Sequence, residues 1–234
     1  MSAGRRVSGE PGIVLHVRPY RETSAIVSLL TRHYGRVAGV ARGVRGTRRG
    51  SPVQPFSSVV TGWSGRGGLL TLTNIESVRQ PWLKGEAMNA AFYVVELVTR
   101  LVAEGESAPR IFAALSWALE RLSSQDAELA VTLRSFEKLL LQELGYGLDF
   151  RHDASSGEPI AQDVIYELDV QRGFFPGQPA EGFEGRLLLE IAEENFESAA
   201  VRQAAKRIFR LALGELLGSK PLTSRRLLLR GGEH

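Results

Sequence analysis

Residues 13–41 read IVLHVRPYRETSAIVSLLTRHYGRVAGVA, and this stretch decides the fold of the first third of the chain. Short runs rich in Val, Ile and Leu alternate here with turn residues such as Pro19 and the His33-Tyr34-Gly35 step. Runs of this length and composition, broken by Pro and Gly, predict β-strands. With two further runs downstream, the predicted strands are Ile13 to Val17, Ala25 to Thr31, Arg36 to Ala41, Phe56 to Thr61 and Leu69 to Ser77.

Five short strands in close succession predict a small closed barrel. SH3-like barrels and oligonucleotide-binding (OB) barrels both have five strands, and the long loop from Gly43 to Pro55 favours the OB type. In OB barrels, single-stranded nucleic acid lies on strands 2 and 3 and on the loops that join strands 1 to 2 and 4 to 5. The corresponding loops here are Arg18 to Ser24 and Gly62 to Gly68, and each contains an aromatic residue and an arginine.

After Pro81 the apolar residues recur every three or four positions, a spacing that predicts amphipathic helices. We expect three of them in succession: Glu86 to Glu104, a second that starts near Ser107 and Pro109, and a third from Asp126, as N-cap, to Leu144, before Gly145 as C-cap.

Residues 146–162 are rich in Gly, Asp and Ser and read as a loop, and a strand-like run follows at Val164 to Val170. Helices are predicted again at Phe183 to Asn195 and at Ser198 to Leu217, with Ser198 as cap and Gly218 as end. The predicted class is α+β. It comprises an OB barrel domain at residues 1–80 and a helical domain at residues 81–234, with an irregular or β insertion at about 146–180.

The net charge of +3 conceals a gradient along the chain. Residues 1–85 carry thirteen Lys and Arg against three acids, whereas residues 86–234 carry sixteen against twenty-three. A basic first part of +10 beside an acidic remainder of −7 predicts that the barrel binds a polyanion. A second basic stretch, Arg202 to Arg230, holds eight basic residues and one acid.

Catalytic chemistry is not predicted. The chain has no cysteine, and its four histidines lie in unrelated contexts. No phosphate-binding glycine motif occurs, and no apolar run approaches the roughly 20 residues that a membrane helix needs. We therefore expect a cytoplasmic protein without cofactor or metal, associated with the nucleoid if the polyanion is DNA.

The arginines near strand 3, together with nearby aromatic rings, predict a groove for single-stranded DNA. Phosphates give such a site salt-dependent affinity, and bases stack on the rings at about 1–3 kcal/mol each. We expect Phe56 in the barrel core and Tyr20 and Tyr34 at the surface, and the pattern leaves Trp63 open. The predicted DNA-binding residues are Arg18, Tyr20, Arg21, Tyr34, Arg36, Arg42, Arg45, Arg48, Arg49, Trp63 and Arg66.

Four stretches resemble a known family when they are taken together in their order along the chain. They are GIVLHVRPYRETSAIVSLLTRHYGRVAGVARGVRG from Gly12, QPF at residues 54–56, LRSFEKLLLQELGYGLDF at residues 133–150 and GSKPLTSRRLLL at residues 218–229. The family is RecO, a group of recombination mediators in DNA repair, and the resemblance covers nearly the whole chain.

The resemblance implies an OB domain, a helical domain and no enzymatic activity. Members bind single- and double-stranded DNA, anneal complementary strands without ATP, and help to load the recombinase RecA in the RecF pathway. The partners it implies are RecR and the acidic C-terminal tail of single-stranded DNA-binding protein (SSB). One form of the family holds zinc with four cysteines after the LGY motif, but the corresponding loop here, residues 151–157, reads RHDASSG, so zinc is not expected.

The SSB tail ends in a hydrophobic residue and a free carboxylate, a ligand that suits an apolar stripe beside an arginine. On the third predicted helix, Arg134 stands where the family resemblance is found, next to the stripe that includes Leu133, and Lys138 adds charge one turn on. These three residues are the predicted tail-binding site. The alternative is that Arg134 is a solvated residue paired with Glu137.

Two other functions fit the same residues. An RNA-binding OB protein, such as a translation or ribosome-associated factor, shares the barrel and the charge, and competition between DNA and RNA oligomers separates the two. A hydrolase with an unrecognised site is the third reading, which nuclease assays with Mg²⁺ or Mn²⁺ address.

Overall fold

A computed structural model describes residues 6–44, 53–65, 69–126, 128–178 and 182–224. The chain divides into two compact units: unit 1 comprises residues 1–127 and 222–234, and unit 2 comprises residues 128–221. Arg45, Arg48, Arg49 and Arg66, predicted to bind DNA, lie outside the described residues.

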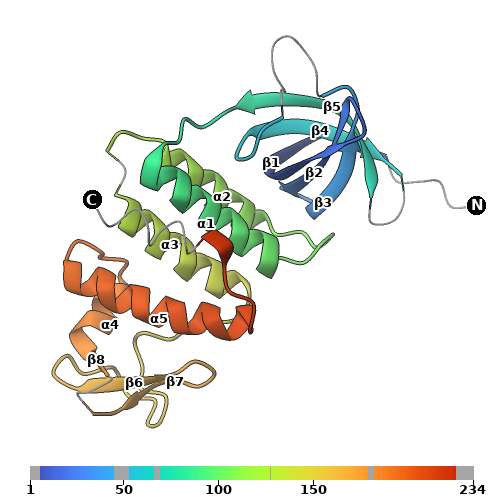
Figure 1. Cartoon of the computed structure of the whole chain (residues 1–234). Helices are drawn as coiled ribbons and strands as arrows, with labels where there is room; N and C mark the ends of the chain where they lie inside the picture. The colour runs from blue at the N-terminus through green and yellow to red at the C-terminus, as the bar shows by residue number, and fades with distance from the viewer. Residues whose placement is uncertain (1–5, 45–52, 66–68, 127, 179–181, 225–234) are drawn as a thin grey trace, which may run out of the picture. The chain divides into compact units, whose positions relative to one another are not determined.

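Unit 1 begins with a closed barrel in the strand order β1-β2-β3-β5-β4 (Figure 1). All neighbouring strands are antiparallel except β3 and β5, which pair in parallel from Gly39 opposite Leu70 to Ala41 opposite Leu72. This arrangement confirms the predicted OB barrel. The strands are β1 (Val7–Tyr20), β2 (Ser24–Thr31), β3 (Gly35–Ala41), β4 (Ser58–Ser64) and β5 (Leu70–Arg79).

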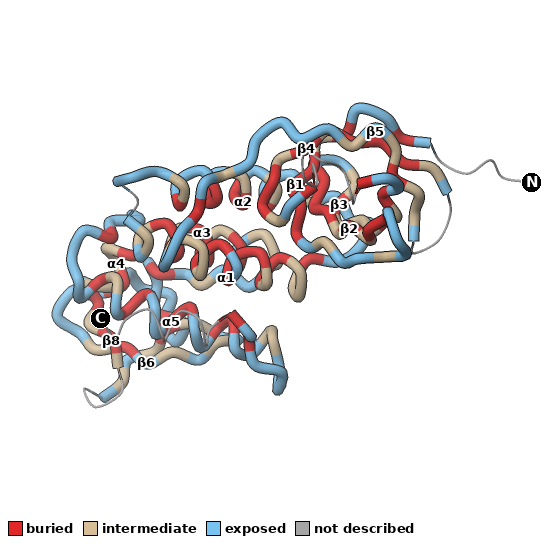
Figure 2. Tube along the Cα trace, turned by 45° about the horizontal axis from the view of Figure 1, so that its top comes forward, coloured by how far each residue is buried: buried red, intermediate tan, exposed pale blue. Residues whose placement is uncertain are grey.

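The barrel core consists mainly of aliphatic residues, and Figure 2 colours the buried residues along the strands red. Val14, Val27 and Leu29 are fully buried, and Val44 and Val53 close the core from the two ends of the long loop after β3. Two strands extend beyond their predicted C-terminal ends into the loops predicted to hold DNA. β1 continues through Pro19 to Tyr20, and β4 continues to Ser64, so both loops predicted to hold DNA are shorter than expected.

Two helices complete the described helical part of unit 1, α1 (Gly85–Leu101) and α2 (Pro109–Leu122). Each buries one face, which includes Val94, Leu97 and Val98 on α1 and Leu115 and Leu119 on α2. The prediction rested on the three-and-four spacing of apolar residues in both segments. Both helices are present, and α1 ends at Leu101 rather than at the predicted Glu104.

Unit 2 combines helices with a small antiparallel sheet of order β7-β6-β8. The N-cap predicted for α3 is wrong: the cap position is Glu128, not Asp126, and its side chain makes no capping hydrogen bond. The helix predicted from Phe183 begins only at Gly185, after a two-residue strand. The elements are α3 (Leu129–Glu143), β6 (Ile165–Asp169), β7 (Gly173–Pro176), β8 (Phe183–Glu184), α4 (Gly185–Ala192) and α5 (Ala199–Leu217).

Both ends of α5 follow the predicted rules for helix caps. The Ser198 hydroxyl accepts a hydrogen bond from Val201 N at 3.1 Å, and Gly218 ends the helix with a φ of 63°. A cluster of Phe150, Phe174, Phe183 and Phe209 holds the small sheet and α5 together inside unit 2. No described helix in either unit is long and apolar enough to cross a membrane.

Candidate nucleic-acid interface

The register of the barrel brings four of the predicted residues together around the start of β2. Arg18 lies opposite Ile26 and Tyr20 opposite Ser24, on one side of β2. On its other side Ala25 lies opposite Ala41, so Arg42 leaves β3 at the same end. Arg21, in the tight turn between β1 and β2, is the fourth member. We call Arg18, Tyr20, Arg21 and Arg42 the cationic end.

The three arginines of the cationic end are exposed, and Tyr20 is half-buried. The Arg21 guanidinium lies over the Tyr20 ring, 5.1 Å from its centre, in a cation–π contact. Arg21 has a φ of 55°, a left-handed conformation that makes the turn tight. Phosphates and bases can meet complementary groups here without any rearrangement of the core.

The opposite end of the barrel is the turn between β2 and β3, and it is tied to other parts of unit 1. The buried Glu10 carboxylate accepts hydrogen bonds from His33 N at 2.8 Å and contacts His33 Nδ1 at 3.0 Å. Gly35 has a φ of 63°, and a Cβ there would lie 1.9 Å from the Glu106 carbonyl oxygen. The turn therefore packs directly against the connection between α1 and α2.

Arg36, on β3 next to this turn, is a predicted DNA-binding residue whose side chain makes contacts within unit 1 in this structure. Its Nη1 donates to the carbonyl oxygens of Thr99 and of Val102, the latter at 2.7 Å, and its Nη2 donates to Glu104 at 3.1 Å. These are unpaired carbonyls at the C-terminal end of α1, where a cation is also favoured by the helix dipole. Only 14% of the side chain is exposed, so Arg36 joins the barrel to α1.

Some of the predicted aromatic residues are also buried in unit 1 rather than exposed at the barrel surface. Phe56 is buried, as expected, but outside the barrel core cluster, where it packs edge-on against Phe92 of α1 at 5.0 Å. Trp63, which the sequence left open, is 4% exposed and packs at a right angle to Tyr34, with ring centres 5.2 Å apart. Trp63 is a core residue and offers no stacking surface. Tyr34 is half-buried against it rather than projecting into solvent.

The three predicted tail-binding residues are buried inside unit 2, which corrects the expectation that Arg134 projects beside an apolar stripe. Leu133, Arg134 and Lys138 are 8%, 7% and 7% exposed. Arg134 Nη2 donates to Glu137 Oε1 at 2.8 Å, so the alternative pairing is present, although not in solvent. Lys138 Nζ donates to the carbonyl oxygens of Ile191 and Ala192, at 3.0 and 2.8 Å, at the end of α4.

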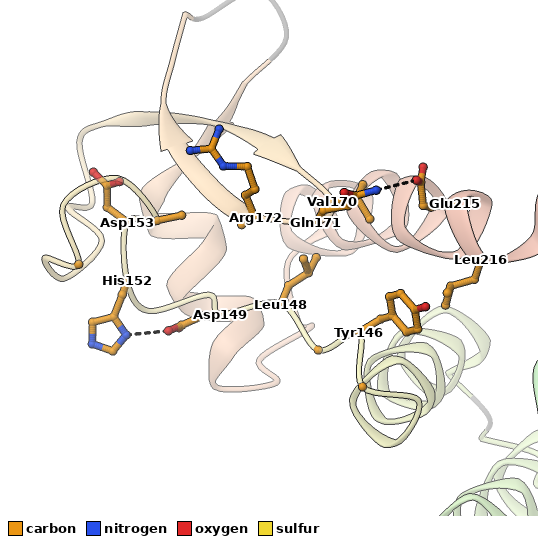
Figure 3. A pocket seen from close by; sticks show the side chains of 15 residues that line it. Tyr146, Leu148, Asp149, His152, Asp153, Val170, Gln171, Arg172, Glu215 and Leu216 are labelled. Carbon is orange, nitrogen blue, oxygen red and sulfur yellow. Dashed lines mark hydrogen bonds and ion pairs between the residues drawn. The ribbon is translucent and has the colours of Figure 1, made fainter.

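The loop after α3 is held by Asp153, which accepts hydrogen bonds from the Ser155 hydroxyl at 2.6 Å and from Ser155 N at 2.7 Å. These bonds lower the pKa of Asp153. Burial alone would raise the pKa of Asp149, but hydrogen bonds from Arg151 N and from the His152 ring lower it. Figure 3 shows the loop beside an open hollow of about 930 Å³. Within the described residues, no three His, Asp or Glu side chains gather in a way that could hold a metal ion.

Sequence reasoning missed one polar contact in unit 1. The Glu96 carboxylate on α1 accepts hydrogen bonds from Thr223 N, Ser224 N and the Ser224 hydroxyl at 2.8, 2.8 and 2.5 Å. Burial alone would raise the pKa of Glu96, but these bonds lower it. The available signal was the Thr-Ser pair in the GSKPLTSRRLLL stretch, because such residues cap helices and turns.

A closed five-stranded OB barrel, followed by a helical body and carrying a cationic end with an aromatic ring, defines the class as an OB-fold protein with an added helical domain. Comparison with family models gives the particular family. Residues 7–81 match the recombination protein O N-terminal model, and residues 83–226 match the C-terminal model. The chain belongs to the RecO family, in the form that lacks the zinc-binding cysteines.

Relatives resemble the chain over nearly its whole length. DNA repair protein RecO of Cellvibrio japonicus is 38% identical over 236 residues, which cover 98% of this chain and 100% of the relative. The protein of the same name from Coxiella burnetii (strain RSA 493) is 40% identical, over 96% of this chain and 99% of the relative. That from Haemophilus influenzae (strain Rd) is 41% identical over 92% and 93%.

Proposed function

We propose that this chain is a recombination mediator in DNA repair, which binds single- and double-stranded DNA and anneals complementary strands without a catalytic site. The observation that carries the proposal is the cationic end, where Arg18, Arg21 and Arg42 are exposed around Tyr20. Neutralising phosphates there lowers the repulsion between two strands, and base pairing supplies the driving force for annealing.

Annealing needs both strands close to cationic groups, and unit 2 offers a second set. Lys206, Arg207 and Arg210 are exposed on α5, spaced so that they lie along one side of the helix. With one cationic surface on each compact unit, a single molecule has groups for two strands. This supports annealing rather than simple coating of one strand.

The partners in the proposal are RecR, RecA and the SSB tail, with the nucleoid as the place of action. The tail is an acidic peptide, and we place its site on unit 2, where Arg134 is the residue to test. Because Arg134 is paired with Glu137, a tail carboxylate has to replace Glu137. Titration of a labelled tail peptide against wild type and Arg134→Ala decides this, since equal affinities would move the site to the exposed basic face of α5.

Annealing of complementary oligonucleotides coated with cognate SSB, without nucleotide, tests the proposed function as a whole. We expect faster annealing than with SSB alone. The same experiment with RNA oligomers as competitor addresses the RNA-binding alternative, because tighter binding of RNA would contradict a DNA repair role. Nuclease activity with Mg²⁺ or Mn²⁺ would contradict the absence of catalysis.

A further inference from the structure

Trp82 lies outside the barrel, in the connection between β5 and α1, and 75% of it is exposed. The other two tryptophans of the chain differ, since Trp63 is 4% exposed and Trp117 on α2 is 42% exposed. A Trp ring is one of the largest apolar surfaces a protein can bury, so a ring held open in this way is informative. Lys84 Nζ lies over the ring, 4.8 Å from its centre, which leaves the opposite face available.

The connection that holds Trp82 is linked to the cationic end through the barrel itself. β3 and β5 run in parallel, so β5 leaves the barrel at the end where Arg42 leaves β3. The long loop that starts at Arg42 returns at residues 53–57, and there Gln80 Nε2 donates to the Pro55 carbonyl oxygen at 3.3 Å. The Ser57 hydroxyl donates to Gln80 Oε1 as well. The described ends of this loop thus lie at the cationic end and against Gln80, which precedes Trp82 by two residues.

Lys84 places a cation at the Trp82 ring, and the sequence up to Gly85 is basic as a whole, although the exposed Glu86 in the first turn of α1 is acidic. Lys84 is exposed, and residues 1–85, to which the connection belongs, have a net charge of +10. An aromatic ring with a cation at one face can stack on a base while the cation meets the neighbouring phosphate. Unpaired bases alone present an open face for stacking, because those of a duplex are already stacked on one another.

We infer that Trp82 is a base-stacking platform that extends the DNA path from the cationic end along the connection to α1, and that it acts on single strands only. This inference rests on the DNA binding proposed above. Stacking contributes about 1–3 kcal/mol per base in single-strand binding proteins, which corresponds to roughly a 5- to 150-fold change in affinity.

The test uses the full chain and three fluorescently labelled ligands: an oligothymidylate, an abasic strand of equal length and a blunt duplex. Trp82→Ala should bind the oligothymidylate roughly 5- to 150-fold more weakly, with little change for the abasic strand and the duplex. Trp82→Phe keeps a ring and should retain most of the affinity. Trp117→Ala is the matched control and should bind all three ligands like wild type.

Two results would overturn the inference. One is an equal affinity of Trp82→Ala and wild type for the oligothymidylate, as expected if the ring instead contacts a protein. The other is an equal loss on all three ligands, which shows that Trp82 supports the structure and not a base. Failure of wild type to bind any of the three would contradict the proposed function itself, so the two failures are distinguishable.

Discussion

Arg42 leaves β3 at one end of the barrel with an exposed side chain, whereas Arg36, at the start of the same strand, donates to carbonyl oxygens of α1 at the other end. The two residues look alike in the sequence, since both are arginines in a basic, β-rich stretch. The difference lies in what each side chain can reach. The last turn of α1 lies within reach of Arg36 and presents carbonyl oxygens that have no hydrogen-bond donor within the helix. One arginine therefore stabilises the fold, while the other meets solvent and, in our proposal, DNA.

The largest effect is expected from removal of the structural arginine. Arg36→Met should destabilise the protein by about 2–4 kcal/mol, because carbonyls of Thr99 and Val102 lose a charged donor near the end of α1. Arg42→Met is the control and should stay within about 0.5 kcal/mol of wild type, since it is an exposed residue. Urea unfolding followed by circular dichroism measures both, and equal stabilities of the two variants would remove the distinction between the ends.

DNA binding should show the opposite ranking. Arg42→Ala should weaken binding of single-stranded DNA roughly fivefold, as expected for the loss of one phosphate contact. Arg32→Ala is the matched control, because Arg32 is also exposed but lies at the turn between β2 and β3. Fluorescence anisotropy at one fixed salt concentration gives both affinities. A larger loss of affinity for Arg32→Ala than for Arg42→Ala would place the DNA at the turn between β2 and β3, contrary to our proposal.

Glu96 extends the comparison to an acidic side chain that binds backbone groups, those of Thr223 and Ser224. Its pKa is lowered in the folded protein, so the carboxylate stabilises the fold above the ordinary value near 4.5, and this contribution is lost as the pH falls through the lowered value. Glu96→Gln should cost about 1 kcal/mol at pH 7. Below the lowered pKa, the free energies of unfolding of wild type and Glu96→Gln should converge. A difference that persists at low pH would show that the charge of Glu96 does not stabilise the fold.

The smallest effect concerns the loop after α3, where Asp153 and Ser155 hold the backbone. Treatment of the purified protein with a chelator should leave Tm unchanged, whereas Asp153→Ala should lower it. Elemental analysis should show no stoichiometric zinc. Zinc bound at one ion per chain would overturn this account of the loop.

Short β-rich runs between turn residues located the barrel strands, and periodicity located the helices, because burial on one helix face imposes a spacing that the sequence displays. The ends of the strands were harder to predict from the sequence. Pro19 reads as a breaker, yet it lies opposite Ala25 near the end of β1, where a missing N–H is tolerated. Gly62 reads as a loop residue, but a Cβ there would lie 2.5 Å from the Val7 carbonyl oxygen, so the barrel needs a glycine inside β4.

The candidate site was predictable in kind but not residue by residue. Charge and aromatic content indicated a nucleic-acid surface at the barrel, and the register then selected Arg18, Tyr20, Arg21 and Arg42. The remaining features depend on contacts between segments that lie far apart in the chain, which the sequence alone does not indicate. No local pattern shows that Trp63 packs on Tyr34, or that Lys138 reaches the end of α4.

The salt dependence of single-stranded DNA binding, measured for wild type and for Arg18→Ala/Arg21→Ala/Arg42→Ala, tests the central claim most directly. With about 5 phosphates neutralised, a plot of log affinity against log salt should fall with a slope of about −3.5 for wild type. The triple variant should fold normally and give a slope of about −1.4, because about 3 contacts are lost. A wild-type slope near zero, or an unchanged slope in the variant, would contradict the assignment of DNA binding to the cationic end.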